Sequence, residues 1–142
     1  MTDSAGQISQ FVSVLKDITQ VRRQQEHEIQ LQLARRAQQR FYAPRVTWPN
    51  LDIGLAVYPA IEIGGDYIDL IPASDNCLSV AVGDVSGHGF DSSLLMAMTR
   101  AYVRSYCAQE LGLVDIIAGV NRMLVADLEE SRYVTLLLNI TP

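Results

Sequence analysis

Two glycine-aspartate motifs limit how this chain of 142 residues can fold. The first is Ile63-Gly64-Gly65-Asp66, and the second runs from Val82 to Gly89 with the sequence Val-Gly-Asp-Val-Ser-Gly-His-Gly. In each motif an aspartate follows an apolar run beside glycines, which let a backbone approach a ligand or take a positive φ. Either motif alone is also typical of an ordinary turn. If Asp66 and Asp84 stand on neighbouring strands, their carboxylates can meet at one end of a sheet.

Two carboxylates brought together in this way repel each other, and one of them is pushed towards protonation. A divalent cation removes that repulsion. The two motifs supply oxygen ligands and no histidine or thiolate pair, so the expected ion is hard, Mg²⁺ or Mn²⁺. Carboxylates that bridge two such ions can activate a water between them, an arrangement suited to hydrolysis of a phosphate ester.

The chain around the motifs has the pattern of an α+β fold. The glycine-rich stretch from Gly83 to Gly89 is predicted to form a loop, and Asp91, Ser92 and Ser93 can cap the helix that follows it. The final strand has no evident partner, so the pattern looks like a sandwich cut part-way, with an unpaired edge. We predict strands at 51–58, 67–71, 77–82 and 133–138, and helices at 91–109 and 114–129.

The beginning of the chain has a different composition. Residues 1–45 carry seven basic and four acidic residues (net +3), whereas residues 46–142 carry four basic and twelve acidic ones (net −8). The basic stretch has no interleaved aromatic residues, which favours a solvated helix face over a nucleic-acid site. Gln20 to Tyr42 contains no Gly or Pro and predicts one helix with a thin apolar seam, capped by Asp17 or Thr19. Such a seam suggests a parallel dimer or a connecting rod, and a surface helix on the next domain fits equally well.

Three segments follow from this reading: a short strand at 8–15 within residues 1–19, a linker helix over 20–43, and a domain over 44–142. Cys77 and Cys107 have no metal-type spacing, which favours a reducing compartment. We expect no signal peptide and no membrane segment, and therefore a cytoplasmic protein.

A family resemblance adds to this reading. Glu62 to Asp69 together with Ala81 to Arg104 resemble the SpoIIE/RsbU-like branch of the PPM metal-dependent protein serine/threonine phosphatases. The helical stretch from Leu31 to Pro44 resembles the lead-in helix of that family. Gly6 to Thr19 resembles the last strand of a PAS sensor domain, which ends in Asp-Ile-Thr.

The resemblance implies a PPM-type αββα sandwich, here partial and without its C-terminal half, and a two-metal site between the sheets. It implies that Asp66 and Asp84 are the catalytic metal ligands, joined by the carbonyl of Val85, with Gly65, Gly87 and Gly89 in support. Asp69 would have an orienting role. The implied substrate is a phosphoserine or phosphothreonine on a regulatory, anti-anti-sigma-like protein, attacked by a metal-activated water without a covalent phosphoenzyme.

The sequence also departs from the family. His88 lies two residues later than the histidine of eukaryotic relatives, so it is not expected to be a general acid. Gly65 replaces a metal-binding glutamate. The family's further metal aspartates have no counterpart, because Asp115 and Asp127 fall on the second predicted helix. We therefore expect an incomplete fragment with little activity.

Two other readings remain. One is a non-catalytic signalling or dimerisation module that contains a phosphatase-like half domain. The other is a diguanylate cyclase, suggested by Gly64-Gly65-Asp66, but that motif needs an acidic and then an aromatic residue where this chain has Tyr67-Ile68.

Overall fold

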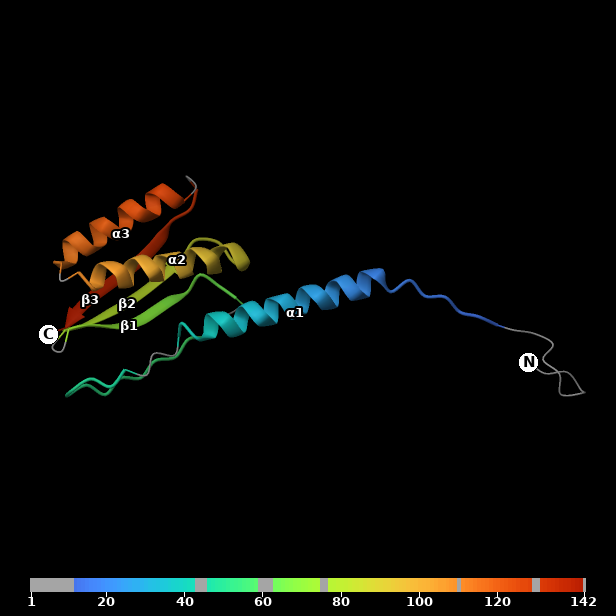
Figure 1. Cartoon of the computed structure of the whole chain (residues 1–142), viewed down its shortest axis with the longest axis horizontal. Helices are drawn as coiled ribbons and strands as arrows, with labels where there is room; N and C mark the ends of the chain where they lie inside the picture. Colours follow the sequence, from blue (N-terminus) through green and yellow to red (C-terminus); the bar gives the residue numbers. More distant parts are fainter. Residues whose placement is uncertain are drawn as a thin grey trace, which may run out of the picture. The chain divides into compact units, whose positions relative to one another are not determined.

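The computed structural model describes residues 12–42, 46–58, 63–74, 77–109, 111–128 and 131–141. The chain divides into two units, Met1–Gln30 and Leu31–Pro142, each of which is described by itself. Figure 1 labels the elements along the chain. Their order is α1 (Thr19–Gln39), β1 (Tyr67–Ser74), β2 (Cys77–Val85), α2 (Phe90–Cys107), α3 (Leu113–Asp127) and β3 (Val134–Thr141).

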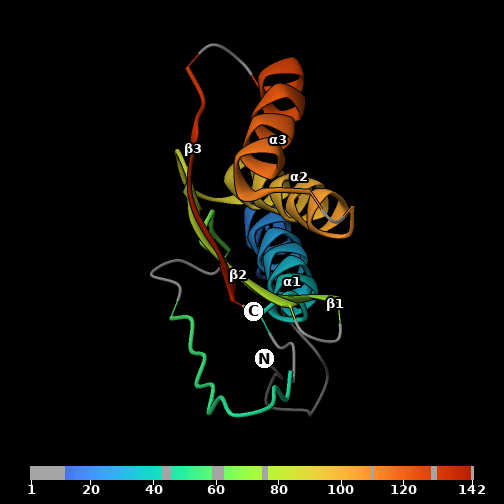
Figure 2. The same cartoon turned by 90° about the vertical axis from the view of Figure 1, so that its left-hand side faces the viewer.

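The second unit is an α+β fold, as the sequence predicted. Its three strands form an antiparallel sheet in the order β1-β2-β3. Helices α2 and α3 cover one face of this sheet (Figure 2). The core lies between them, because alternate strand residues point towards the helices. It includes Tyr67, Ile71, Ala81, Val85, Met96, Val103, Ile116, Val120 and Leu138.

The strand β2 is longer than predicted. It continues through Gly83, Asp84 and Val85, so the loop before α2 starts at Ser86 and not at Gly83. The prediction that the final strand has no partner was also wrong, since β3 pairs with β2 from Leu78↔Thr141 to Val85↔Val134. Pairing with two neighbours keeps β2 extended where its glycine would favour a turn. β1 likewise runs past Pro72, which is tolerated because this strand lies at an edge of the sheet among the described residues.

Two predicted strands do not form in the described residues. In the predicted strand at 51–58, Leu51 makes only an isolated bridge with Trp48, and residues 52–58 have no ladder pairing. Of the predicted strand at 8–15, residues 12–15 are not a strand and the others lie outside the described residues. An extended run of apolar residues becomes a strand only where another backbone pairs with it. The PAS resemblance of Gly6 to Thr19 stays a prediction.

Helices α2 and α3 cross closely. A Cβ built on Gly119 of α3 would collide with the Tyr106 ring of α2, so a larger residue there requires the ring to move. The Tyr102 hydroxyl donates a hydrogen bond to the Asp127 carboxylate nearby. The predicted capping of α2 was wrong, because Gly89 is the N-cap without a side-chain bond. Ser92 and Ser93 instead donate to the carbonyls of Gly89 and Phe90.

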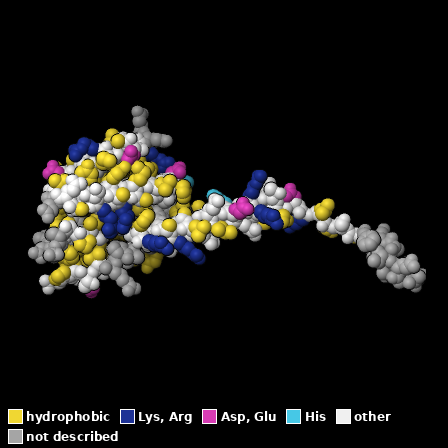
Figure 3. Space-filling model, in the orientation of Figure 1, with side chains coloured by type: hydrophobic (Ala, Val, Ile, Leu, Met, Phe, Trp, Pro, Cys, Tyr) yellow, Lys and Arg dark blue, Asp and Glu magenta, His cyan; other side chains and the backbone are white. Residues whose placement is uncertain are grey.

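Helix α1 agrees with the predicted helix but ends at Gln39. The Asp17 carboxylate accepts a hydrogen bond from the Thr19 N–H at 2.8 Å, and this bond lowers the pKa of Asp17. The apolar residues of the predicted seam are exposed: Ile18 directly before α1, and Val21, Ile29 and Leu33 within it. None of the helices within the described residues is sufficiently long and apolar to cross a bilayer. Hydrophobic side chains also remain exposed over the strand-and-helix unit (Figure 3).

Candidate functional site

Asp66 and Asp84 are cross-strand neighbours. The pairing of Tyr67 with Gly83 continues one step further, because the Val85 N–H donates to the Gly65 carbonyl at 3.3 Å. Asp66 therefore stands opposite Asp84 at a non-hydrogen-bonded position, where Cβ atoms are typically about 4.5–5.5 Å apart. Both side chains are exposed. By strand alternation they point away from the face that α2 and α3 cover. The structure thus brings the two aspartates together, as the sequence indicated.

Asp66 and Asp84 line an open hollow of about 490 Å³. Its lining also includes Val82 and Leu137, which are 44% and 63% exposed, so the floor beside the carboxylates is apolar. The donors at hand are carboxylate and carbonyl oxygens, which suit a hard divalent ion. No group of three or more His, Cys, Asp or Glu side chains gathers among the residues that the structure describes. The donor set therefore fits one part of a metal site, and ligation by Asp66, Asp84 and Val85 stays a prediction.

Gly65 is required by the close approach of two backbones. A Cβ at this position would lie 2.6 Å from the Val85 carbonyl oxygen and 2.9 Å from the Val85 Cβ. Side chains do not approach a carbonyl so closely without a shift of the backbone. Gly65 therefore keeps β1 against β2 beside the aspartate pair, a structural reason for its supporting role.

The loop after β2 is held by the residues before β3. Ser86 accepts a hydrogen bond from the Tyr133 N–H at its hydroxyl (3.0 Å) and donates its own N–H to the Tyr133 carbonyl (2.9 Å). Gly87 and Gly89 have φ values of 95° and 80°, which residues with a side chain rarely adopt. Arg132 lies next to Gly87 and donates to the Ser86 carbonyl at 3.4 Å. His88 is exposed in this loop.

The end of α1 contacts the segment that leads into β1. The Gln38 side chain donates to the Gly64 carbonyl at 2.6 Å and accepts from the Gly64 N–H at 3.3 Å. The Tyr42 hydroxyl donates to the Asp66 carbonyl at 2.6 Å. Burial, and secondarily the charge of Asp66, raise the pKa of Tyr42 to about 12. Sequence reasoning missed both residues, since a glutamine in a glutamine-rich helix carries no signal of burial.

Asp69 does not join Asp66 and Asp84. It lies three residues along β1, so alternation places it on the opposite face, under α2, where it is fully buried. Arg104 binds its carboxylate through two hydrogen bonds of 2.6 and 2.7 Å, and Arg100 lies 3.5 Å away. Burial and the neighbouring carboxylate raise the pKa of the Tyr67 phenol. The predicted orienting role is therefore not supported by the geometry, which makes Asp69 an anchor between β1 and α2.

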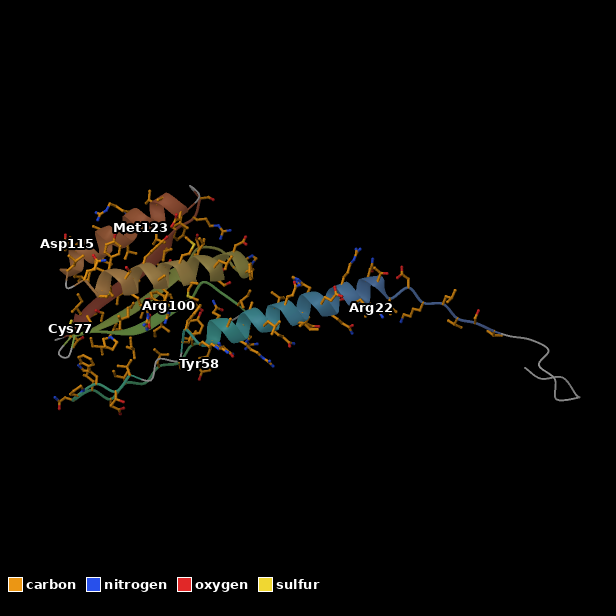
Figure 4. All side chains as sticks on the ribbon, viewed as in Figure 1. Arg22, Tyr58, Cys77, Arg100, Asp115 and Met123 are labelled. Atoms are coloured by element: carbon orange, nitrogen blue, oxygen red, sulfur yellow. The ribbon has the colours of Figure 1, made fainter. Side chains whose placement is uncertain are left out.

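Figure 4 shows where three labelled side chains of this unit lie. Arg100 projects from α2, and its guanidinium lies 4.9 Å from the centre of the Phe41 ring. Asp115 lies at the start of α3, at the end of the unit where Cys77 begins β2 and therefore far from Asp84. Asp127 is bonded to Tyr102. As predicted, both of these aspartates belong to α3. Cys77 and Cys107 are free thiols, and Cys107 is buried.

Three comparisons with known proteins agree with one another. Residues 74–141 match the family model for stage II sporulation protein E (SpoIIE). The phosphoserine phosphatase RsbU of Bacillus subtilis is 25% identical over 114 residues, which cover 80% of this chain and 34% of that protein. This chain thus spans about a third of the length of that relative. A crystal structure of RsbU and RsbW domains from Mycobacterium tuberculosis matches with a TM-score of 0.51 and 25% identity, over 58% of this chain and 23% of that one.

Proposed function

We propose that this chain, which is similar to SpoIIE/RsbU-like phosphatases, carries part of a metal-dependent domain that hydrolyses phosphoserine or phosphothreonine on a regulatory protein. The observation that carries the proposal is the placement of Asp66 directly opposite Asp84 on the exposed face of the sheet. The Bacillus subtilis relative is described as a phosphoserine phosphatase, and this description supports phosphoserine as the substrate. The anti-anti-sigma-like character of the substrate protein rests on the family resemblance.

The residues proposed to hold Mg²⁺ or Mn²⁺ are Asp66 and Asp84, together with the Val85 carbonyl. A divalent ion at such a site lowers the pKa of a bound water and polarises a phosphoryl oxygen. The two carboxylates contribute the negative charge, and their mutual repulsion favours uptake of a cation. Gly89 supports the loop after β2 through its positive φ, which residues with a side chain rarely adopt.

The test is metal binding compared across three matched aspartate variants. Calorimetric titration with Mn²⁺ is expected to show weak binding by the unmodified chain and its loss in Asp66→Asn and Asp84→Asn. Asp115→Asn, at the far end of the unit, serves as the control and binds as before. Equal binding by all four proteins would overturn the proposed site.

Catalysis is tested separately with a generic aryl phosphate in the presence of Mn²⁺. We expect slow turnover at most, because the described residues supply only two of the carboxylates that such a site needs. Robust hydrolysis that Asp84→Asn abolishes would refute this expectation and leave the phosphatase assignment intact.

A second candidate is a non-catalytic signalling module, in which α1 dimerises and the phosphatase-like unit only binds a partner. It is favoured by the shortage of carboxylates among the described residues. In both versions we propose a cytoplasmic protein without a nucleic-acid partner. The two versions differ in one result: a module binds the phosphorylated partner without consuming it, whereas the enzyme releases phosphate.

A further inference from the structure

The main chain around Gly65 has one side that β2 does not satisfy. In the register of β1 and β2, Gly65 and Tyr67 stand opposite Val85 and Gly83 as hydrogen-bonded pairs. Residues 64 and 66 alternate with them, so their backbone groups point outwards from β2. β1 has no other neighbouring strand in the sheet of the described residues. Those outward groups need partners from elsewhere in the fold.

Two side chains from the end of α1 supply those partners. Gln38 uses both ends of its amide, and thus binds the carbonyl and the N–H of Gly64 as a neighbouring strand would. Tyr42 donates to the carbonyl of Asp66 itself at 2.6 Å. The carbonyl of the proposed ligand is therefore fixed from one side, while its side chain faces Asp84.

Burial distinguishes Gln38 from the other glutamines of the helix. It is 5% exposed and is the buried residue of α1, whereas the adjacent Gln39 is exposed. A buried amide is costly unless its polar atoms are bonded. Both of its functional atoms are bonded, and both bonds go to Gly64. The position is thus built for this contact and not for solubility.

We propose that Gln38 and Tyr42 are positioning residues that hold the main chain of Asp66 so that its carboxylate faces Asp84. This inference rests on the proposed function. It adds two residues that touch neither the ion nor the substrate and that act through the backbone of residues 64–66. It also makes the end of α1 part of the framework of the site.

The experiment compares Gln38→Leu and Tyr42→Phe with Gln39→Leu, a matched change on an exposed neighbour. Tyr42→Phe removes one oxygen atom and keeps the ring that packs against the core. The first readout is hydrogen exchange of the Gly64 amide by NMR without metal. We expect Gln38→Leu to accelerate this exchange about tenfold or more, a change that corresponds to the loss of about 1.4 kcal/mol of protection. Gln39→Leu is expected to leave it unchanged.

The second readout is Mn²⁺ affinity by calorimetry. Gln38→Leu and Tyr42→Phe are expected to weaken binding by about tenfold and about fivefold, because the first removes two hydrogen bonds to the main chain of residues 64–66 and the second removes one. Gln38→Glu would put a carboxylate oxygen against the Gly64 carbonyl in a buried position, so it is expected to weaken binding at least as much as Gln38→Leu. Unchanged affinity in Gln39→Leu is expected to separate positioning from a general effect of replacing a glutamine of α1.

The outcomes also separate this proposal from the proposed function. Unchanged Gly64 exchange in Gln38→Leu, or unchanged Mn²⁺ affinity in folded Gln38→Leu and Tyr42→Phe, overturns the positioning role. Loss of binding in Asp66→Asn and Asp84→Asn would still uphold the metal site in that case. If those two aspartate variants bind as tightly as the unmodified chain, the proposed site itself fails, and the positioning role fails with it.

Discussion

At the scale of single residues, Gly65 is important because it has no side chain, which lets its backbone lie close to Val85 beside the aspartate pair. The contact of 2.6 Å between a built Cβ and the Val85 carbonyl oxygen cannot be relieved by rotating a side chain, since it involves backbone. We predict that Gly65→Ala destabilises the unit by about 1–3 kcal/mol, the usual cost of overpacking. It should also weaken Mn²⁺ binding, because β1 would move away from β2 beside Asp66. Urea unfolding and calorimetry measure the two effects.

The neighbouring glycine is the control for this prediction. A Cβ on Gly64 would meet nothing within 4 Å, and the bonds from Gln38 reach only its backbone. Gly64→Ala should therefore unfold at nearly the same urea concentration as the unmodified chain. Equal destabilisation by the two substitutions would show that the close approach at Gly65 is not what matters.

The buried carboxylate of Asp69 leads to a second prediction at this scale. Arg104→Met removes the two shortest hydrogen bonds of the Asp69 carboxylate. The carboxylate then remains fully buried with weaker partners. We expect a loss of about 3 kcal/mol in the free energy of unfolding, at the lower end for a broken buried pair because Arg100 remains nearby. Urea unfolding measures the loss.

The matched change Arg122→Met, at an exposed position of α3, should cost little. The double variant Asp69→Leu with Arg104→Met should recover much of the lost stability, since it removes the unpaired charge as well. No recovery would mean that the pair contributes more than its burial costs.

At the scale of elements, the crossing of α2 and α3 depends on Gly119. Alanine is normally the better helix former by about 1 kcal/mol. Here its Cβ would collide with the Tyr106 ring at three atoms within 2.7 Å. We predict that Gly119→Ala lowers stability by about 1–3 kcal/mol despite its helix propensity. Thermal unfolding followed by circular dichroism measures this change.

A second substitution tests the cause of that loss. Combining Gly119→Ala with Tyr106→Leu removes the ring, so the loss in the double variant should be smaller than the sum of the two single losses. Simple additivity would indicate that the two helices do not meet at this point.

The strands show which sequence signals were sufficient. Apolar runs beside the two motifs predicted β1 and β2, and glycine punctuation placed the end of β2 too early. A similar apolar run at 51–58 did not become a strand in the described residues. The difference is a pairing partner, which a local pattern does not contain.

At the scale of the whole molecule, the exposed seam of α1 bears on assembly. Val21 and Ile29 are 47% and 56% exposed, so the seam of α1 is accessible to a second helix. We predict a parallel dimer in solution through α1. The double variant Val21→Gln with Ile29→Gln should dissociate it and leave the second unit folded, as measured by sedimentation velocity. A monomer already in the unmodified chain would favour the connecting rod.

The sequence by itself determined the α+β class, the helical lead-in and the pair of aspartates at strand ends, because each depends on short-range spacing and backbone preference. The tertiary structure decided which face each side chain took. Strand alternation in one register put Asp66 and Asp84 together and turned Asp69 under α2. The end of α1, 26 residues before Gly64 in the sequence, came to bind the main chain of Gly64. Such outcomes depend on which backbones pair and pack, and no local pattern carries that information.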